Sequence, residues 1–196
     1  MSSAPTFLDD LSAQQLSESA AIFGVSTAST LTYAALCELS EAGARSLVAA
    51  AGSSDSPGSP VLDFVDEGVP MVLAILSILK SGSVCVPADP ATPRLRLCAL
   101  VDDLDARVAL CLGAAIGSLL SRGGWCDGPS SPQLLSIEAI IGPAAPAPAP
   151  SLHQPTARCL CHLVYTSGST GRPKAVAVEH GALRAYAQER VRAHGI

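Results

Sequence analysis

Ten residues from Tyr165 to Lys174 combine the side chains and the backbone freedom that a phosphate-binding loop requires. Gly168 and Gly171 tolerate positive φ angles, so successive backbone N–H groups can turn toward one oxyanion. The segment also carries hydroxyl donors and an ammonium suited to phosphate, on Thr166, Ser167, Ser169, Thr170 and Lys174. Apolar runs at 160–164 and 175–178 flank it. We therefore expect a polar loop between two strands, where function tends to concentrate.

A Walker A loop is the first alternative for this segment. That motif needs a Gly-Lys pair followed by Ser or Thr, whereas Arg172-Pro173 separates Gly171 from Lys174, and Ala175 follows. Pro173 also fixes φ and removes a donor, so it does not open a helix in the Walker manner. A flexible Ser/Gly turn is the second alternative. Linkers of that kind lack flanking β-branched strands and a terminal Pro-Lys.

The decapeptide resembles the phosphate-loop signature of the adenylate-forming enzymes, Tyr-Thr-Ser-Gly-Ser-Thr-Gly-x-Pro-Lys. These AMP-dependent synthetases and ligases include acyl-CoA synthetases, luciferases and the adenylation domains of nonribosomal peptide synthetases. Residues 31–36, Leu-Thr-Tyr-Ala-Ala-Leu, and residues 79–90, Leu-Lys-Ser-Gly-Ser-Val-Cys-Val-Pro-Ala-Asp-Pro, are similar to two motifs of the peptide-synthetase branch. The departures are Ser83 and Ala175, which replace glycines, and Cys85, which replaces a tyrosine.

The resemblance implies an α/β fold, a layered parallel sheet with flanking helices that forms the N-terminal part of the large domain. It also implies an ATP-dependent enzyme that activates a carboxylic acid as acyl-AMP with release of pyrophosphate, with an amino acid as the expected substrate. The cofactors would be ATP and Mg²⁺. The polyphosphate contacts that it implies are Thr166, Ser167, Gly168, Ser169, Thr170, Gly171 and Lys174.

The resemblance covers only part of such an enzyme. No residue matches the family's catalytic lysine or its magnesium-binding carboxylate, which would follow Ile196. We therefore expect an N-terminal piece, inactive alone, with 1–19 as an extension, 20–196 as a partial AMP-binding domain and 142–155 as a Pro/Ala-rich surface linker. A carrier-protein domain is a candidate downstream partner. Two alternatives stay open: a non-catalytic remnant, and a nucleotide-binding or interaction module.

Composition bounds the class of protein. The chain has 196 residues, is 48% hydrophobic and carries a net charge of −5, which predicts a buried core and argues against a nucleic-acid partner. The seven cysteines are an odd number, typical of a reducing, cytoplasmic setting. The N-terminus lacks a basic n-region, so no signal peptide is predicted. The longest apolar run, Val69–Leu79, is shorter than the ~20 residues of a membrane span, so we predict no membrane partner.

Strand and helix patterns alternate along the chain, which predicts a parallel sheet. The predicted helices are 7–23, 33–50 with Thr32 as its cap, 69–80, 92–104 opened by Thr92-Pro93, 114–121 and 180–194. The predicted strands are 61–65, 84–87, 106–112, a short one within 134–141, 160–166 and 174–179.

Several polar residues near these elements are expected to have structural roles. Asp89, between two prolines, should form a turn and cap the next helix. Tyr165 should pack, His180 should start a helix, and Arg184 should face water or the rest of a larger protein. In Cys159-Leu-Cys161-His162, strand alternation would place His162 opposite the thiols, so no metal site is predicted.

Overall fold

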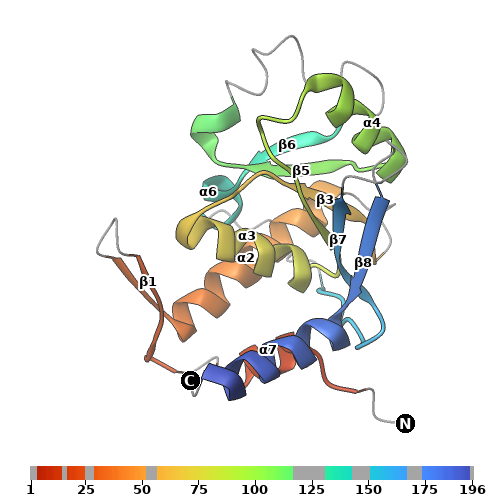
Figure 1. The fold of residues 1–196 in the computed structure, drawn as a ribbon. Helices are drawn as coiled ribbons and strands as arrows, with labels where there is room; N and C mark the ends of the chain where they lie inside the picture. Colours follow the sequence, from red (N-terminus) through yellow and green to blue (C-terminus); the bar gives the residue numbers. More distant parts are fainter. Residues whose placement is uncertain are drawn as a thin grey trace.

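The computed structural model describes residues 4–14, 17–24, 29–51, 57–116, 131–142, 151–166 and 174–194. Its elements alternate between helix and strand for most of the chain (Figure 1). The helices are α1 (Phe7–Ser12), α2 (Tyr33–Ala51), α3 (Gly68–Lys80), α4 (Arg94–Leu104), α6 (Ile137–Ile140) and α7 (His180–His194). The strands are β1 (Ala20–Gly24), β2 (Ser29–Thr32), β3 (Pro60–Asp63), β4 (Val84–Pro87), β5 (Val108–Cys111), β6 (Gln133–Ser136), β7 (Leu160–Thr166) and β8 (Lys174–Glu179).

A six-stranded sheet in the order β6-β5-β3-β4-β7-β8 forms the centre of the molecule. All its neighbouring strands are parallel except β7 and β8, which form an antiparallel pair at one edge. The predicted α/β class with a mostly parallel sheet is confirmed. A separate antiparallel pair, β1-β2, stands beside α2 and α3.

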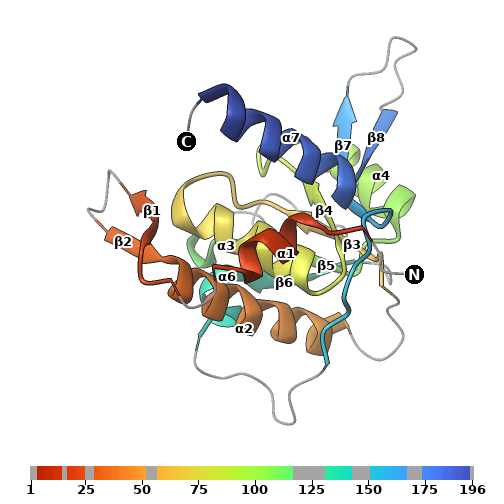
Figure 2. The same cartoon turned by 90° about the horizontal axis from the view of Figure 1, so that it is seen from below.

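The central strands β3, β4 and β5 are buried on both faces and are almost wholly apolar, as expected of parallel strands covered on each side. One face packs on α2, α3 and α6 through residues such as Val61, Cys85 and Leu110. The other face packs on α4 through Leu62 and Val86, the neighbours in sequence of the first two. Figures 1 and 2 show α2 and α3 on one side of the sheet and α4 on the other.

Local signals explain where several helices begin and end. Thr32 caps α2 as predicted, because its hydroxyl oxygen accepts a hydrogen bond from the Ala35 N–H at 3.2 Å. Gly82, at φ 81°, follows the end of α3, a backbone conformation that glycine adopts at little cost. The Ser136 hydroxyl accepts from the Ala139 N–H at 3.1 Å and starts α6. That cap divides the apolar run 134–141 into the end of a strand and a short helix.

Three expectations about elements are wrong. The predicted helix 7–23 ends at Ser12, and residues 20–24 form β1, because Ile22 pairs with Leu31 of β2 in an antiparallel register that helical periodicity does not report. Thr92 is not the cap of α4. Pro93 holds that position, with its carbonyl accepting from the Leu97 N–H. Asp89 does form a turn, but its carboxylate accepts from the Ala91 N–H at 2.7 Å and does not cap α4.

The Pro/Ala-rich linker lies partly outside the described residues. Its last part, residues 151–155, has no regular secondary structure and runs past α2 and the end of α3. Of the predicted helix 114–121, the structure describes one helical turn at 113–116. Among the described helices, none combines the length and apolar character that crossing a membrane requires.

Candidate functional site

The two described residues of the predicted site, Thr166 and Lys174, lie at one end of the β7–β8 hairpin, called the hairpin mouth below. They form the last residue pair of the antiparallel register at that end, and the Thr166 hydroxyl donates to the Lys174 carbonyl oxygen at 3.3 Å. Both residues are exposed. The structure therefore brings together a hydroxyl-bearing residue and a lysine at the hairpin mouth. Five predicted contacts lie outside the described residues: Ser167, Gly168, Ser169, Thr170 and Gly171.

The hairpin has the predicted boundaries and is anchored on one side only. β7 pairs with β4 through the Cys85–His162 register, and Cys161 is fully buried with its thiol against the Val178 carbonyl at 3.3 Å. β8 is the edge strand, and Val176 remains 50% exposed. The β-branched residues of both strands favour the extended backbone. Strand β7 is therefore held within the sheet, and the exposed edge strand β8, which begins at Lys174, pairs with it.

Tyr165 fixes the end of β7 to a helix. Its hydroxyl donates to the Asp103 carboxylate of α4 at 2.6 Å, and its ring packs with the α4-side cluster. Burial, reinforced by the Asp103 carboxylate, raises the pKa of Tyr165 to about 12. The phenol therefore stays protonated as a donor, which confirms the expected packing role.

His180 is the first residue of α7 and is almost completely buried, at 1% exposure. Its backbone N–H donates to the Cys159 carbonyl at 2.9 Å, whereas its Nδ1 has no hydrogen-bond partner among the described residues. Burial lowers the pKa of His180, with a further lowering from His162 and an opposing effect of Asp9. A buried neutral imidazole at a helix start fits the predicted structural role.

Asp63 was missed by the sequence reasoning. It ends β3, is only 5% exposed, and accepts hydrogen bonds from the Val65 N–H at 3.0 Å and from the Cys85 thiol at 3.7 Å. Burial raises the pKa of Asp63 to about 6. Burial, together with the Asp63 carboxylate, also raises the pKa of Cys85, so that thiol is not a nucleophile. The available signal was an aspartate that interrupts the apolar run 61–65.

A cavity of about 400 Å³ lies away from the hairpin mouth, between α1, α2, the end of α3 and residues 151–155. Its lining includes Arg45 and Lys80, but Arg45 pairs with Glu41, and the Lys80 ammonium donates to the Cys37 carbonyl at 3.0 Å. None of the described residues of the predicted site lines it. Over the described part of the chain, no group of three or more His, Cys, Asp and Glu side chains is placed to hold a metal ion.

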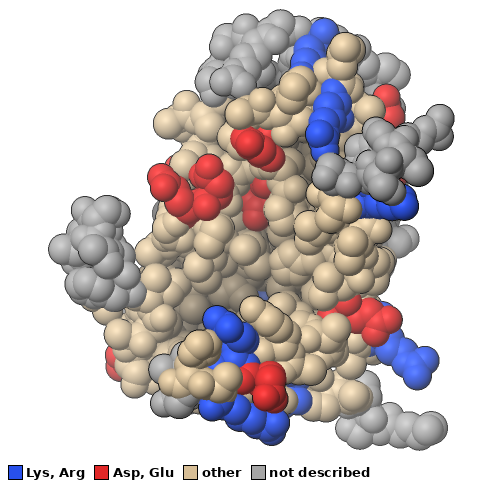
Figure 3. Space-filling view, viewed as in Figure 1, with Lys and Arg blue, Asp and Glu red and all other residues tan. Residues whose placement is uncertain are grey.

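Charge is dispersed over the face of the molecule drawn in Figure 3. Basic side chains occur there in small separate groups among a largely uncharged surface, and acidic side chains stand between them.

Comparison with known proteins places this geometry in a family. A family model described as AMP-binding enzyme matches residues 10–194. The nonribosomal peptide synthetase otaB of Aspergillus niger is 36% identical over 177 residues, which are 90% of this chain and 9% of that protein. Chondramide synthase cmdD of Chondromyces crocatus is 32% identical over 170 residues, 85% of this chain and 4% of that protein. The chain thus spans less than a tenth of these curated relatives.

Solved structures share the fold. The nonribosomal peptide synthetase FmoA3 in its AMPPNP-bound form aligns with a TM-score of 0.78 and 20% identity, over 99% of this chain and 20% of that chain. The sequence resemblance to adenylate-forming enzymes of the peptide-synthetase branch is confirmed by these relatives. Because the family model matches most of this chain, the chain belongs to the AMP-binding enzyme family.

Proposed function

We propose that this chain supplies the phosphate-binding loop of an enzyme that activates a carboxylic acid as acyl-AMP. The observation that carries the proposal is the hairpin mouth, where Thr166 and the exposed Lys174 stand at the two ends of a Ser/Thr/Gly segment. A relative that is a nonribosomal peptide synthetase supports an amino acid as the substrate. The AMPPNP bound to FmoA3 supports ATP as the second substrate.

In the proposed reaction a carboxylate oxygen of the acid attacks the α-phosphorus of ATP. The P–O bond to the β-phosphate breaks, and pyrophosphate leaves with the electron pair of that bond. The protein's task is to hold the polyphosphate in line and to balance its charge. Lys174 supplies the cation, while Ser167, Ser169 and Thr170, with the backbone at Gly168 and Gly171, supply N–H and O–H donors. The Thr166 hydroxyl would join them by exchanging its bond to the Lys174 carbonyl for one to a phosphate oxygen. Tyr165 and its contact with Asp103 fix the inner strand beneath them.

Magnesium fits the polyphosphate as a counter-ion, but no described cluster of side chains is suited to hold it. We therefore assign no ligand of Mg²⁺ to the described residues and derive no step through the metal. The proposal includes a carrier-protein partner in the full-length protein, a cytoplasmic setting, and the predicted layout of an extension at 1–19, a partial AMP-binding domain at 20–196 and a linker at 142–155.

Substitution of Lys174 in the full-length protein tests the proposal. Lys174→Ala should lower kcat/KM for ATP about tenfold to a hundredfold, the effect of a lost hydrogen bond to a charged group. The KM for the acid should stay unchanged, because the lysine is assigned to the leaving group. Lys174→Arg keeps the charge and should recover part of the loss. Pyrophosphate exchange with ATP and acid varied separately measures both effects. Unchanged ATP dependence and turnover in Lys174→Ala would remove the assigned role.

A further inference from the structure

Helices from opposite ends of the sequence, α1 and α7, are in contact (Figure 2). Although α1 has only six residues, it is firmly built into the fold. Leu8 and Leu11 are buried in the main core, and the Leu11 carbonyl faces the thiol of Cys37 in α2 at 3.9 Å. At its start, the N–H and the hydroxyl of Thr6 donate to the Asp9 carboxylate at 2.6 and 2.9 Å. These contacts fix the position of α1, so α1 can in turn hold α7.

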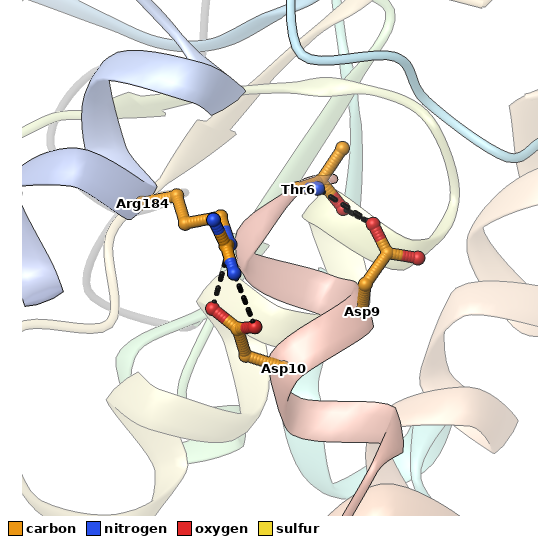
Figure 4. A network of polar contacts seen from close by, with 4 residues as sticks. All are labelled: Thr6, Asp9, Asp10 and Arg184. Atoms are coloured by element: carbon orange, nitrogen blue, oxygen red, sulfur yellow. Dashed lines mark hydrogen bonds and ion pairs between the residues drawn. The ribbon is translucent and has the colours of Figure 1, made fainter. Parts of the chain in front are cut away.

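The contact to α7 is a two-pronged ion pair (Figure 4). The Arg184 guanidinium donates from Nε to Oδ2 of Asp10 and from Nη2 to Oδ1, both at 2.8 Å. The side chains are 25% and 45% exposed. Such a fork fixes direction as well as distance, because two parallel bonds join two planar groups. This placement also corrects the expectation that Arg184 faces water or a missing part of the protein.

Beyond its first turn, α7 has few other attachments. The structure describes α7 throughout, and His180 is its one buried residue. The first turn is anchored by backbone bonds, among them Gly181 N–H to the Ala157 carbonyl at 2.8 Å. Farther along, Tyr186 is 64% exposed and Val191 is 47% exposed. The Asp10–Arg184 ion pair therefore lies between the buried first residue of α7 and its exposed later turns.

We infer that residues 4–14, the amino-terminal strap, position α7, with Arg184 as the positioning residue that the strap holds. Because α7 follows β8 without an intervening residue, the strap also steadies the carboxyl end of β8. Lys174 stands at the opposite end of that strand, about 17 Å away at the usual rise per residue. Any influence on the phosphate loop rests on the proposed function and should be small.

Amide hydrogen exchange measured by mass spectrometry tests the positioning role without any assay of activity. Asp10→Asn and Arg184→Met should each speed exchange in 180–188 about two- to fivefold, the range for a partly exposed ion pair. Arg192→Met is the matched control, since it removes a cation from the same helix whose pair with Glu189 is exposed and 3.6 Å long. The control should leave exchange in 180–188 unchanged. The double variant Asp10→Arg with Arg184→Asp should restore the slow exchange.

Unchanged exchange in both single variants would overturn the inference, as would an equal acceleration in Arg192→Met. In the full-length protein the same variants should raise the KM for ATP by no more than about fivefold and leave the KM for the acid unchanged. A higher KM for ATP together with faster amide exchange in 180–188 supports both the positioning role of the strap and the proposed function. If exchange accelerates while ATP dependence stays constant and Lys174→Ala is also silent, the proposed function fails and the strap stands.

Discussion

Asp63 should make stability depend on pH in a way that can be isolated by one substitution. Its carboxyl is buried at the end of β3, and its pKa rises from the ordinary value of 3.8 to about 6. The folded protein therefore holds a proton between these two pH values that the unfolded chain releases. The carboxyl thus favours folding at low pH, and this contribution is lost as the pH rises through the window from about 3.8 to about 6.

The magnitude follows from the pKa difference. At about 1.4 kcal/mol for each pKa unit, ionisation of Asp63 lowers the free energy of unfolding by about 3 kcal/mol across that window. Asp63→Asn keeps an oxygen that can accept from the Val65 N–H and cannot ionise. The stability of the variant relative to the original protein should therefore increase by about 2.5 kcal/mol between pH ~4 and pH ~7.

Urea unfolding followed by circular dichroism at several pH values measures this difference. The comparison with the variant is necessary because His162 and His180, whose pKa values are lowered by burial, oppose Asp63 over part of the same range. Asp105→Asn serves as the control, since the Asp105 side chain is 77% exposed, and its curve should parallel that of the original protein. A difference in stability between Asp63→Asn and the original protein that stays constant with pH would show that the buried Asp63 carboxyl does not ionise in this window.

Three further predictions concern packing, protonation and activity. Gly43→Ala should destabilise the fold by about 2 kcal/mol in urea unfolding. The new Cβ would lie 2.3 Å from the Ser77 hydroxyl oxygen in the α2–α3 contact, and this clash outweighs the higher helix propensity of Ala. Gly113→Ala is the control and should change stability little, because its Cβ would have its nearest contact at 3.4 Å. His180→Leu should weaken the loss of stability that the original protein shows as the pH falls below about 6.5, since the lowered pKa of His180 makes protonation unfavourable only in the folded state; a pH profile identical to that of the original protein would contradict the assignment. The 196 residues alone should give no pyrophosphate exchange above background with any of a panel of amino and aryl acids, and clear exchange with one acid would contradict this expectation.

Where local chemistry decides structure, the sequence predicted it well. The hairpin strands 160–166 and 174–179, the strand 84–87 and the helix 180–194 have the predicted boundaries, because β-branched runs and a polar loop are local signals. Thr32 was a readable cap for the same reason. Residues 20–24 were mispredicted because their strand exists only through pairing with 29–32. A periodicity that suits a helix cannot report that pairing.

The candidate site divides in the same way. Thr166 and Lys174 were predicted from residue types and are placed together by the antiparallel register. The raised pKa of Asp63 was not predictable, because it arises from burial between neighbouring strands, which outweighs the lowering effect of the hydrogen bonds from the Val65 N–H and the Cys85 thiol. The Asp10–Arg184 pair joins residues separated by 174 positions, and no local pattern connects them. Non-local burial and pairing therefore account for what the sequence could not predict.

A lysine-directed ATP analogue detects contact between Lys174 and the polyphosphate of ATP. These 196 residues hold two lysines, Lys80 and Lys174, and peptide mapping of the full-length protein distinguishes them from each other and from lysines elsewhere in that protein. Lys80 is the internal reference, since it is half-buried and its ammonium donates to the Cys37 carbonyl. An adenosine polyphosphate that carries a pyridoxal group should label Lys174, and excess ATP should suppress this labelling while leaving any label on Lys80 unchanged. Labelling of Lys174 that ATP does not suppress, or protection of Lys80 instead, would show that Lys174 does not contact the polyphosphate.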